Sequence, residues 1–228
     1  MTQAGFGAFG KMPSVGDFLR LNANQAFVQV WDDWIQRSML ACASAAGARW
    51  DAMYMSAPIW RFCLTANLAG PQKMIGVLMP SVDRVGRRFP LTLMAPMHAE
   101  GSALLTHFRE TNLFRQLETL ALRSLEDDMT RSRLNDALTR IPPPSRRSHA
   151  LVRGQSGTMV LTQGEGLSDV LPDLAAGLIA KQYRTPSIWS TEIGGVPRLM
   201  VCEGLPVGAN VQGLFDLHAA IWTEARPL

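Results

Sequence analysis

The chain has 228 residues, of which 47% are hydrophobic and 18% are charged, and its mean hydropathy is +0.04. This balance is typical of a folded globular protein and excludes a disordered, charge-dominated chain. No run approaches the ~18 apolar residues of a membrane-spanning helix, and no basic segment followed by an apolar one opens the chain, so we expect a cytoplasmic protein without membrane insertion. The three cysteines lie far apart in sequence, which excludes a disulfide scaffold and a zinc ribbon.

The net charge is +3 and the isoelectric point is about 9.0. Basic and acidic residues are interspersed rather than striped, so we expect no nucleic acid partner. Nearly all basic residues are arginine, the side chain best suited to pairing with carboxylates and phosphates. A GC-rich genome would give the same preference, and composition alone leaves the two explanations open.

Helical and extended patterns alternate along the first hundred residues. A glycine-rich segment from Gly5 to Gly16 precedes residues 24–46, in which apolar side chains recur at three- and four-residue steps and predict a helix. Three short apolar runs bounded by proline or glycine are predicted as strands: Met53 to Phe62, Met74 to Met79 and Phe89 to Met97.

The pattern then returns to helix from Ser102 to Ile141, in two segments broken near Glu126, Asp127 and Asp128. Three prolines end it, because proline lacks the amide donor of a continuing helix, and residues 142–148 are predicted to be a linker. The remaining predicted elements are a strand from Thr158 to Thr162, a helix from Ser168 to Lys181, strands from Ser187 to Thr191 and from Leu199 to Cys202, and a helix from Asn210 to Trp222. Interleaved strands and helices indicate one layered α/β domain over residues 1–228, in which residues 149–228 complete the fold begun by residues 1–141.

The segment from Gly5 to Lys11 matches two phosphate-binding patterns, G-x-G-x-x-G and most of G-x-x-x-x-G-K-[ST]. Both patterns need a strand before the loop and a helix after it. Only four residues precede Gly5, and Met12 stands where a magnesium-binding hydroxyl is needed. Because of these two departures, a nucleotide-binding enzyme that uses this loop is the alternative hypothesis and not the favoured one. The favoured interpretation is a short first strand followed by a turn at Pro13 to Gly16.

No catalytic constellation and no metal-ligand spacing is recognisable, because the four histidines are scattered and no nucleophile motif occurs. We therefore expect a protein that is not an enzyme and that has no catalytic residues, metal or cofactor.

The densest polar segment lies between Met79 and Leu91 and contains Asp83, Arg84, Arg87 and Arg88. Upstream, Trp60 and Arg61 are predicted to lie on opposite faces of a strand. We predict a partner-binding surface formed by Trp60, Arg61, Asp83, Arg84, Arg87 and Arg88. An internal network that joins Asp83 to the arginines and fixes the loop is equally compatible with the pattern, and both can hold together.

Four segments resemble the signature blocks of the TagF family, also called ImpM, of type VI secretion system-associated proteins. They are GAFGKMPSVGDFLR from Gly7 to Arg20, FVQVWDDWIQ from Phe27 to Gln36, APIWRF from Ala57 to Phe62 and VLMPSVDRVGRRFPLTL from Val77 to Leu93. Beyond about residue 140 no signature is recognisable, so the resemblance belongs to the 1–141 part.

The resemblance implies a three-layer αβα sandwich with one central mixed sheet covered by helices on both faces. It also implies a non-enzymatic, cytoplasmic repressor that holds type VI secretion in check after translation by binding a forkhead-associated scaffold protein. The family is linked to a threonine kinase and to a PppA-like phosphatase, which some relatives carry as a fused domain. It supplies no catalytic residues to carry over to this chain.

Overall fold

A computed structural model of the chain describes residues 5–97, 101–144, 151–154, 157–160 and 167–224. The strands are β1 Gly7–Gly10, β2 Leu19–Leu21, β3 Trp60–Leu64, β4 Lys73–Met79, β5 Leu91–Met97, β6 Leu151–Gly154, β7 Gly157–Val160, β8 Pro186–Ile193 and β9 Val196–Glu203. The helices are α1 Gln25–Ala46, the 3-10 turn Gly47–Arg49, α2 Trp50–Ser56, α3 Ala103–Arg109, α4 Thr111–Arg123, α5 Arg131–Thr139, α6 Leu167–Ile179, α7 Ala209–Phe215 and α8 Ala220–Thr223.

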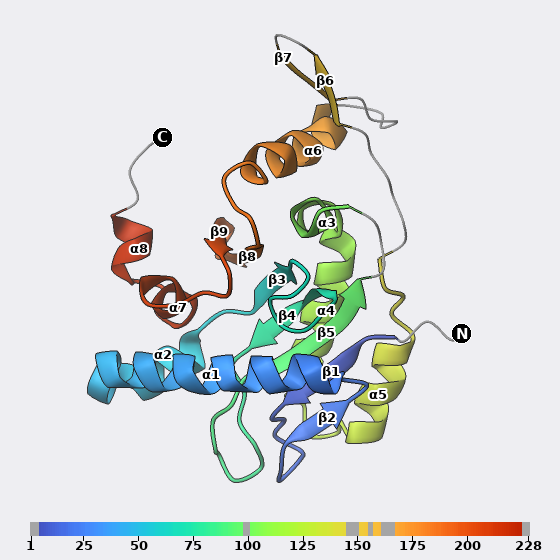
Figure 1. Cartoon of the computed structure of the whole chain (residues 1–228). Coiled ribbons are helices and arrows are strands. Elements are labelled where there is room, and N and C mark those ends of the chain that lie inside the picture. The colour runs from blue at the N-terminus through green and yellow to red at the C-terminus, as the bar shows by residue number, and fades with distance from the viewer. Residues whose placement is uncertain (1–4, 98–100, 145–150, 155–156, 161–166, 225–228) are drawn as a thin grey trace.

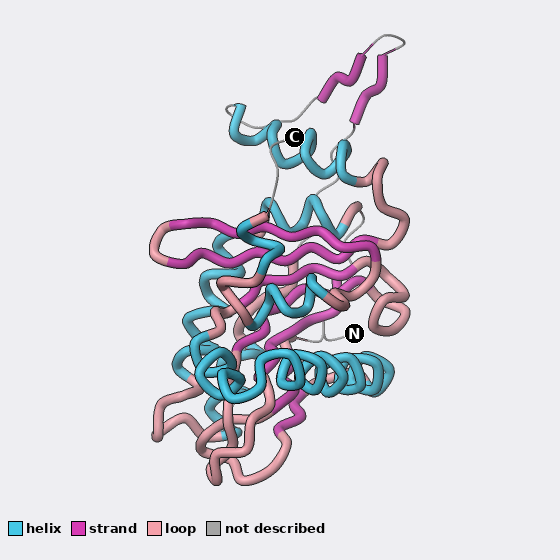
Figure 2. Tube along the Cα trace, turned by 90° about the vertical axis from the view of Figure 1, so that its left-hand side faces the viewer, coloured by secondary structure: helices cyan, strands magenta, loops and turns pink. Residues whose placement is uncertain are grey.

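Seven strands form one sheet in the order β2-β1-β5-β4-β3-β8-β9, and β6 and β7 form a separate hairpin (Figure 1). The expectation of an α/β fold is confirmed, but the expected mixed sheet is wrong, because every pairing in the sheet is antiparallel. Hairpins join β3 to β4, β4 to β5 and β8 to β9. The two strands that a hairpin joins pair side by side and run antiparallel. Figure 2 shows these strands side by side. The C-terminal strands β8 and β9 extend the sheet begun by the N-terminal part, through the pairing of β8 with β3.

Helical side chains pack on both faces of the sheet, because successive side chains of a strand point to opposite faces and nearly all residues of the central strands β4 and β5 are buried. One buried cluster joins the sheet to α3, α4, α5 and α6, and the other joins it to α1, α2 and α7. Within β3, for example, Cys63 belongs to the first cluster, whereas Phe62 and Leu64 belong to the second. The three-layer αβα description remains a prediction.

The helix α1 follows from its sequence. The Asn24 side chain caps the N-terminus by accepting a hydrogen bond from the Ala26 amide, and the predicted apolar stripe is buried. Trp31 is fully buried and donates its indole N–H to the Thr92 hydroxyl of β5 at 2.9 Å. The long helix is thus tied to the centre of the sheet.

Three predicted boundaries are wrong. Residues 50–56 form α2 instead of the start of a strand, the 102–141 region contains three helices instead of two, and the closing helix is interrupted at Asp216. In the first case Tyr54 and Trp50 pack against Phe215 of α7, so a long-range contact selects the helix. Part of the predicted linker, residues 145–148, and of the predicted strand, residues 161–162, lie outside the described residues.

Candidate functional site

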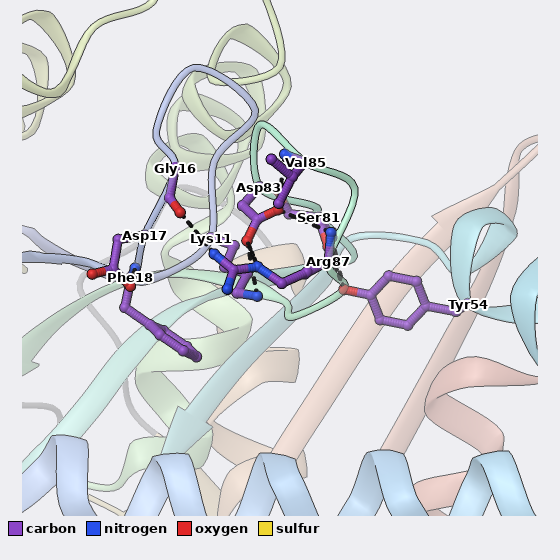
Figure 3. Close-up of polar contacts among 9 residues, drawn as sticks. All are labelled: Lys11, Gly16, Asp17, Phe18, Tyr54, Ser81, Asp83, Val85 and Arg87. Atoms are coloured by element: carbon purple, nitrogen blue, oxygen red, sulfur yellow. Dashed lines mark hydrogen bonds and ion pairs between the residues drawn. The ribbon is translucent and has the colours of Figure 1, made fainter.

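The loop of residues 81–89, which joins β4 to β5, forms the candidate site and is called here the arginine loop. Its two ends are held together by the amide of Phe89, which donates to the Ser81 carbonyl at 3.1 Å, and by a bridge between Val82 and Arg88. Tyr54 of α2 fixes the start of the loop: its hydroxyl donates to the Ser81 carbonyl at 2.7 Å and accepts from the Ser81 amide at 3.0 Å (Figure 3).

Asp83 organises the interior of the arginine loop (Figure 3). Its side chain is fully buried, and its Oδ1 accepts the backbone amides of Arg87 at 2.9 Å and of Val85 at 3.1 Å. Its Oδ2 lies 2.6 Å from Arg87 Nε and 3.0 Å from Lys11 Nζ. Burial opposes the charge, but the Arg87 amide, the Lys11 ammonium, the Arg87 guanidinium and the Val85 amide outweigh it and hold the pKa of Asp83 well below its usual range. The carboxylate is therefore ionised and structural.

A second loop, of residues 11–18, packs beside the arginine loop. Arg87 Nη2 donates to the Gly16 carbonyl at 2.8 Å, and the Arg84 amide donates to the Val15 carbonyl at 3.2 Å. The buried ammonium of Lys11 also lies 5.2 Å from the centre of the Phe18 ring. Together with the Asp83 ion pair, these contacts join two loops that are about seventy residues apart in sequence.

The three arginines of the loop have different partners. Arg87 serves Asp83 and Gly16, and Arg88 Nη2 lies 2.8 Å from Asp51 Oδ2 on α2. The exposed guanidinium of Arg84 lies over Gly16 and has no hydrogen-bond or ion-pair partner among the described residues. Val85 beside it is 70% exposed, and Gly86 takes a positive φ of 81° in the turn. The outer surface of the loop thus offers one unpaired cation next to an exposed apolar side chain.

Trp60 and Arg61 lie away from this surface, on opposite faces of β3 as predicted. Trp60 is buried and donates its indole N–H to the Leu214 carbonyl at 2.8 Å. Arg61 binds Glu118 of α4 through two hydrogen bonds of 2.6 and 2.8 Å, and this pairing raises its pKa although burial opposes it. Of the six residues predicted for the surface, the structure therefore brings together only the four of the arginine loop.

The segment from Gly5 to Lys11 does not have the geometry of a phosphate-binding loop. Residues 7–10 are strand β1, paired with β2 and β5, and residues 11–18 form turns that lead into β2 without a helix. Gly10 is required by backbone contact, since its φ is +133° and a Cβ there would lie 2.0 Å from the Pro90 carbonyl oxygen. Lys11, which the motif would direct at a phosphate, is occupied by Asp83.

Elsewhere in the described residues, one histidine pairs with a serine. His107 Nε2 lies 2.8 Å from Ser190 Oγ, and burial, aided by the Arg61 guanidinium, lowers the pKa of His107 to about 3. Its Nδ1 has no partner in the described part of the chain, so the carboxylate that orients the imidazole of a catalytic triad is missing from this pair. Across the same residues no group of three metal-ligating side chains occurs, and no helix is long and apolar enough to cross a membrane.

Sequence reasoning missed Lys11 and Tyr54 as parts of the site. In the sequence, Lys11 stands out only through the phosphate motif of the alternative hypothesis, and Tyr54 falls in a predicted strand that the structure replaces with α2. The excess of charge in this segment did identify Asp83 and the arginines. The predicted internal network is confirmed for Asp83 and Arg87, whereas in the described part of the chain Arg84 does not pair with Asp83 and Arg88 pairs with Asp51.

Comparisons with known proteins support this description. Residues 7–141 match the family model of the TagF N-terminal domain, type VI secretion system-associated, and all four signature segments lie within the match. The fold is similar to the crystal structure of PA0076 from Pseudomonas aeruginosa PAO1, with a TM-score of 0.76 and 27% sequence identity over 98% of this chain and 97% of that one. No curated protein matches the chain.

Proposed function

Because the chain belongs to the TagF family of type VI secretion system-associated proteins, we propose that it is a non-enzymatic repressor that acts after translation by binding a forkhead-associated scaffold protein in the cytoplasm. The proposal includes the links to a threonine kinase and a PppA-like phosphatase, requires no cofactor, and takes the three-layer αβα sandwich as the family fold.

One observation supports a binding role most directly: the arginine loop is rigidly held from within yet leaves Arg84 unpaired outside. A loop that is fixed before binding loses little conformational entropy when a partner docks. Arginine is enriched among interface hot spots, and Arg84 lies next to Val85, which is 70% exposed. The partner surface that suits this pair carries a carboxylate or phosphate next to an apolar recess.

The test is Arg84→Glu, because this change reverses the charge without removing a hydrogen bond or ion pair found among the described residues. We expect binding to the purified scaffold protein, measured by isothermal titration calorimetry, to weaken at least about tenfold, and repression of secretion to fall in cells. Arg37→Glu is the matched control, since Arg37 is an exposed arginine on α1 that pairs only with its helical neighbour Asp33. Unchanged scaffold binding in a folded Arg84→Glu protein would show that this loop is not the docking surface, and absence of binding in the unmodified chain would reject the proposed partner.

The alternative hypothesis, a nucleotide-binding enzyme that uses the Gly5 to Lys11 segment, predicts that the chain binds a nucleotide. Calorimetric titration with ATP and GTP in the presence of magnesium tests it directly. We expect no saturable heat, because the strand geometry leaves no amide cradle and the ammonium is paired with Asp83. Saturable binding that Lys11→Ala abolishes would restore the enzyme hypothesis.

A further inference from the structure

A second surface, built from different residues than the arginine loop, is an open groove between α4 and α5. Its volume is about 520 Å³, and its floor is apolar, formed by the half-buried Ala137 of α5 and by the outer edges of two largely buried side chains, Leu120 of α4 and Ile141 just after α5. One wall is a stripe of exposed polar residues along α4, which includes Gln116 and Thr119 at three-residue spacing. The groove thus has a narrow apolar strip with a polar margin.

The charges that line the groove have one sign. Arg115 and Arg123 both line it, and none of the described residues that line it is acidic. Because they are eight residues apart on one helix, their Cα atoms are separated by about 12 Å along the axis. Among the described residues, the Arg115 guanidinium donates only to the Asn112 amide oxygen, at 3.2 Å. Arg123 lies 3.9 Å from Glu126 in a pair that is more than half exposed on both sides. Neither guanidinium is held by a buried partner, so both can turn toward a ligand.

The helix that forms this wall is fixed from its other side. Phe114 and Leu117 of α4 are buried in the core, and Glu118 forms the two-bond ion pair with Arg61 of β3. The groove is therefore preformed on a rigid element, which lowers the conformational cost of docking.

We propose that this groove binds an amphipathic helix of a partner protein, with one apolar stripe and two acidic residues about eight positions apart. The apolar floor accepts the stripe, in the manner of helix-in-groove recognition. The spacing of Arg115 and Arg123 matches carboxylates two turns apart on a helix lying along α4. A nucleic acid backbone would satisfy the arginines but would leave the apolar floor without a partner. This inference does not depend on the proposed role of the arginine loop.

The test uses a fluorescein-labelled helical peptide of about 16 residues, with leucines along one face and two glutamates eight positions apart. A second peptide has lysines in place of the two glutamates. Fluorescence anisotropy with the whole chain is expected to show saturable binding of the glutamate peptide and at least about tenfold weaker binding of the lysine peptide. The double variant Arg115→Glu with Arg123→Glu should reverse this preference, and both sites are exposed, so folding should be retained.

Arg37→Glu with Arg49→Glu provides the control, because it changes the net charge equally at exposed sites away from the groove. It should leave the preference for the glutamate peptide unchanged. Equal affinity for the two peptides, the same preference after reversal of Arg115 and Arg123, or no binding to the unmodified chain would each overturn the proposal.

Discussion

Replacing Tyr54 with phenylalanine removes a single oxygen atom from the base of the arginine loop. That hydroxyl is buried, and burial raises the pKa of Tyr54, so it is a neutral donor and acceptor at every pH that the fold tolerates. It serves two backbone groups of the same residue, the amide and the carbonyl of Ser81. Phenylalanine fits the same space, so the change tests these hydrogen bonds with little effect on packing.

The magnitude follows from which partners remain. The Ser81 carbonyl keeps the hydrogen bond from the Phe89 amide, whereas the Ser81 amide has no other partner among the described contacts. An unpaired buried amide costs about 1–3 kcal/mol, and loss of the second hydrogen bond adds about 0.5–1.5 kcal/mol. We therefore expect the free energy of unfolding to fall by about 1.5–4.5 kcal/mol.

Equilibrium unfolding in urea, followed by tryptophan fluorescence, measures this loss. Tyr183→Phe is the matched control, because it deletes the same atom from the second tyrosine, which lies in the turn after α6. Hydrogen exchange supplies a local readout, since the Ser81 amide should exchange faster in Tyr54→Phe. A loss below about 0.5 kcal/mol, or a loss no larger than that of Tyr183→Phe, would refute the idea that Tyr54 anchors the loop.

Two further predictions concern the fold that supports the site. His107 has a pKa of about 3 in the folded chain, below its ordinary value of 6.5, so the unfolded chain binds the additional proton between these values and stability falls as the pH falls from 6.5 towards 3. His107 should therefore make the free energy of unfolding fall by about 1.4 kcal/mol for each pH unit. Urea unfolding between pH 6 and about 4.5 should show that His107→Gln removes this slope, whereas His218→Gln, a change at an exposed site, leaves it intact. Gly10→Ala places a Cβ against the Pro90 carbonyl and should cost at least about 2 kcal/mol, whereas Gly16→Ala meets only the flexible end of Arg84 and should cost less than about 1 kcal/mol; equal losses in thermal unfolding would contradict this.

The periodicity of apolar residues predicted the helices and strands in which it continues over many residues. The stripe of α1, its Asn24 cap and the apolar runs of β4 and β5 are visible in sequence because each follows one periodicity over many residues. The order and direction of the strands were not predictable from these patterns. The pairing of β1 with β5 joins segments about eighty residues apart, and no local periodicity records such a contact.

The same limit applied to the site. The charges between Pro80 and Pro90 marked the arginine loop, but Asp83 reaches Lys11 across 72 positions and Arg61 reaches Glu118 across 57. Each of these ion pairs has one member in a segment that suggested something else, a phosphate motif or an ordinary amphipathic helix. Reasoning from sequence proximity therefore added two residues, Trp60 and Arg61, that do not belong to the surface. It also missed ion-pair partners that are distant in sequence, such as Lys11 and Glu118.

The arginine loop thus contains residues of two kinds, and they should respond differently to substitution. Changing Asp83 leaves the buried Lys11 ammonium without its carboxylate and the Arg87 and Val85 amides without an acceptor, so the loop should lose its conformation and binding should fail even if Asp83 never meets the partner. The Arg84 side chain makes no internal hydrogen bond or ion pair in the described residues, so its substitution should weaken binding while the free energy of unfolding changes little. Loss of binding therefore identifies a contact residue only where stability is retained. Within this loop that criterion separates Arg84 from Asp83, although one is adjacent to the other in sequence.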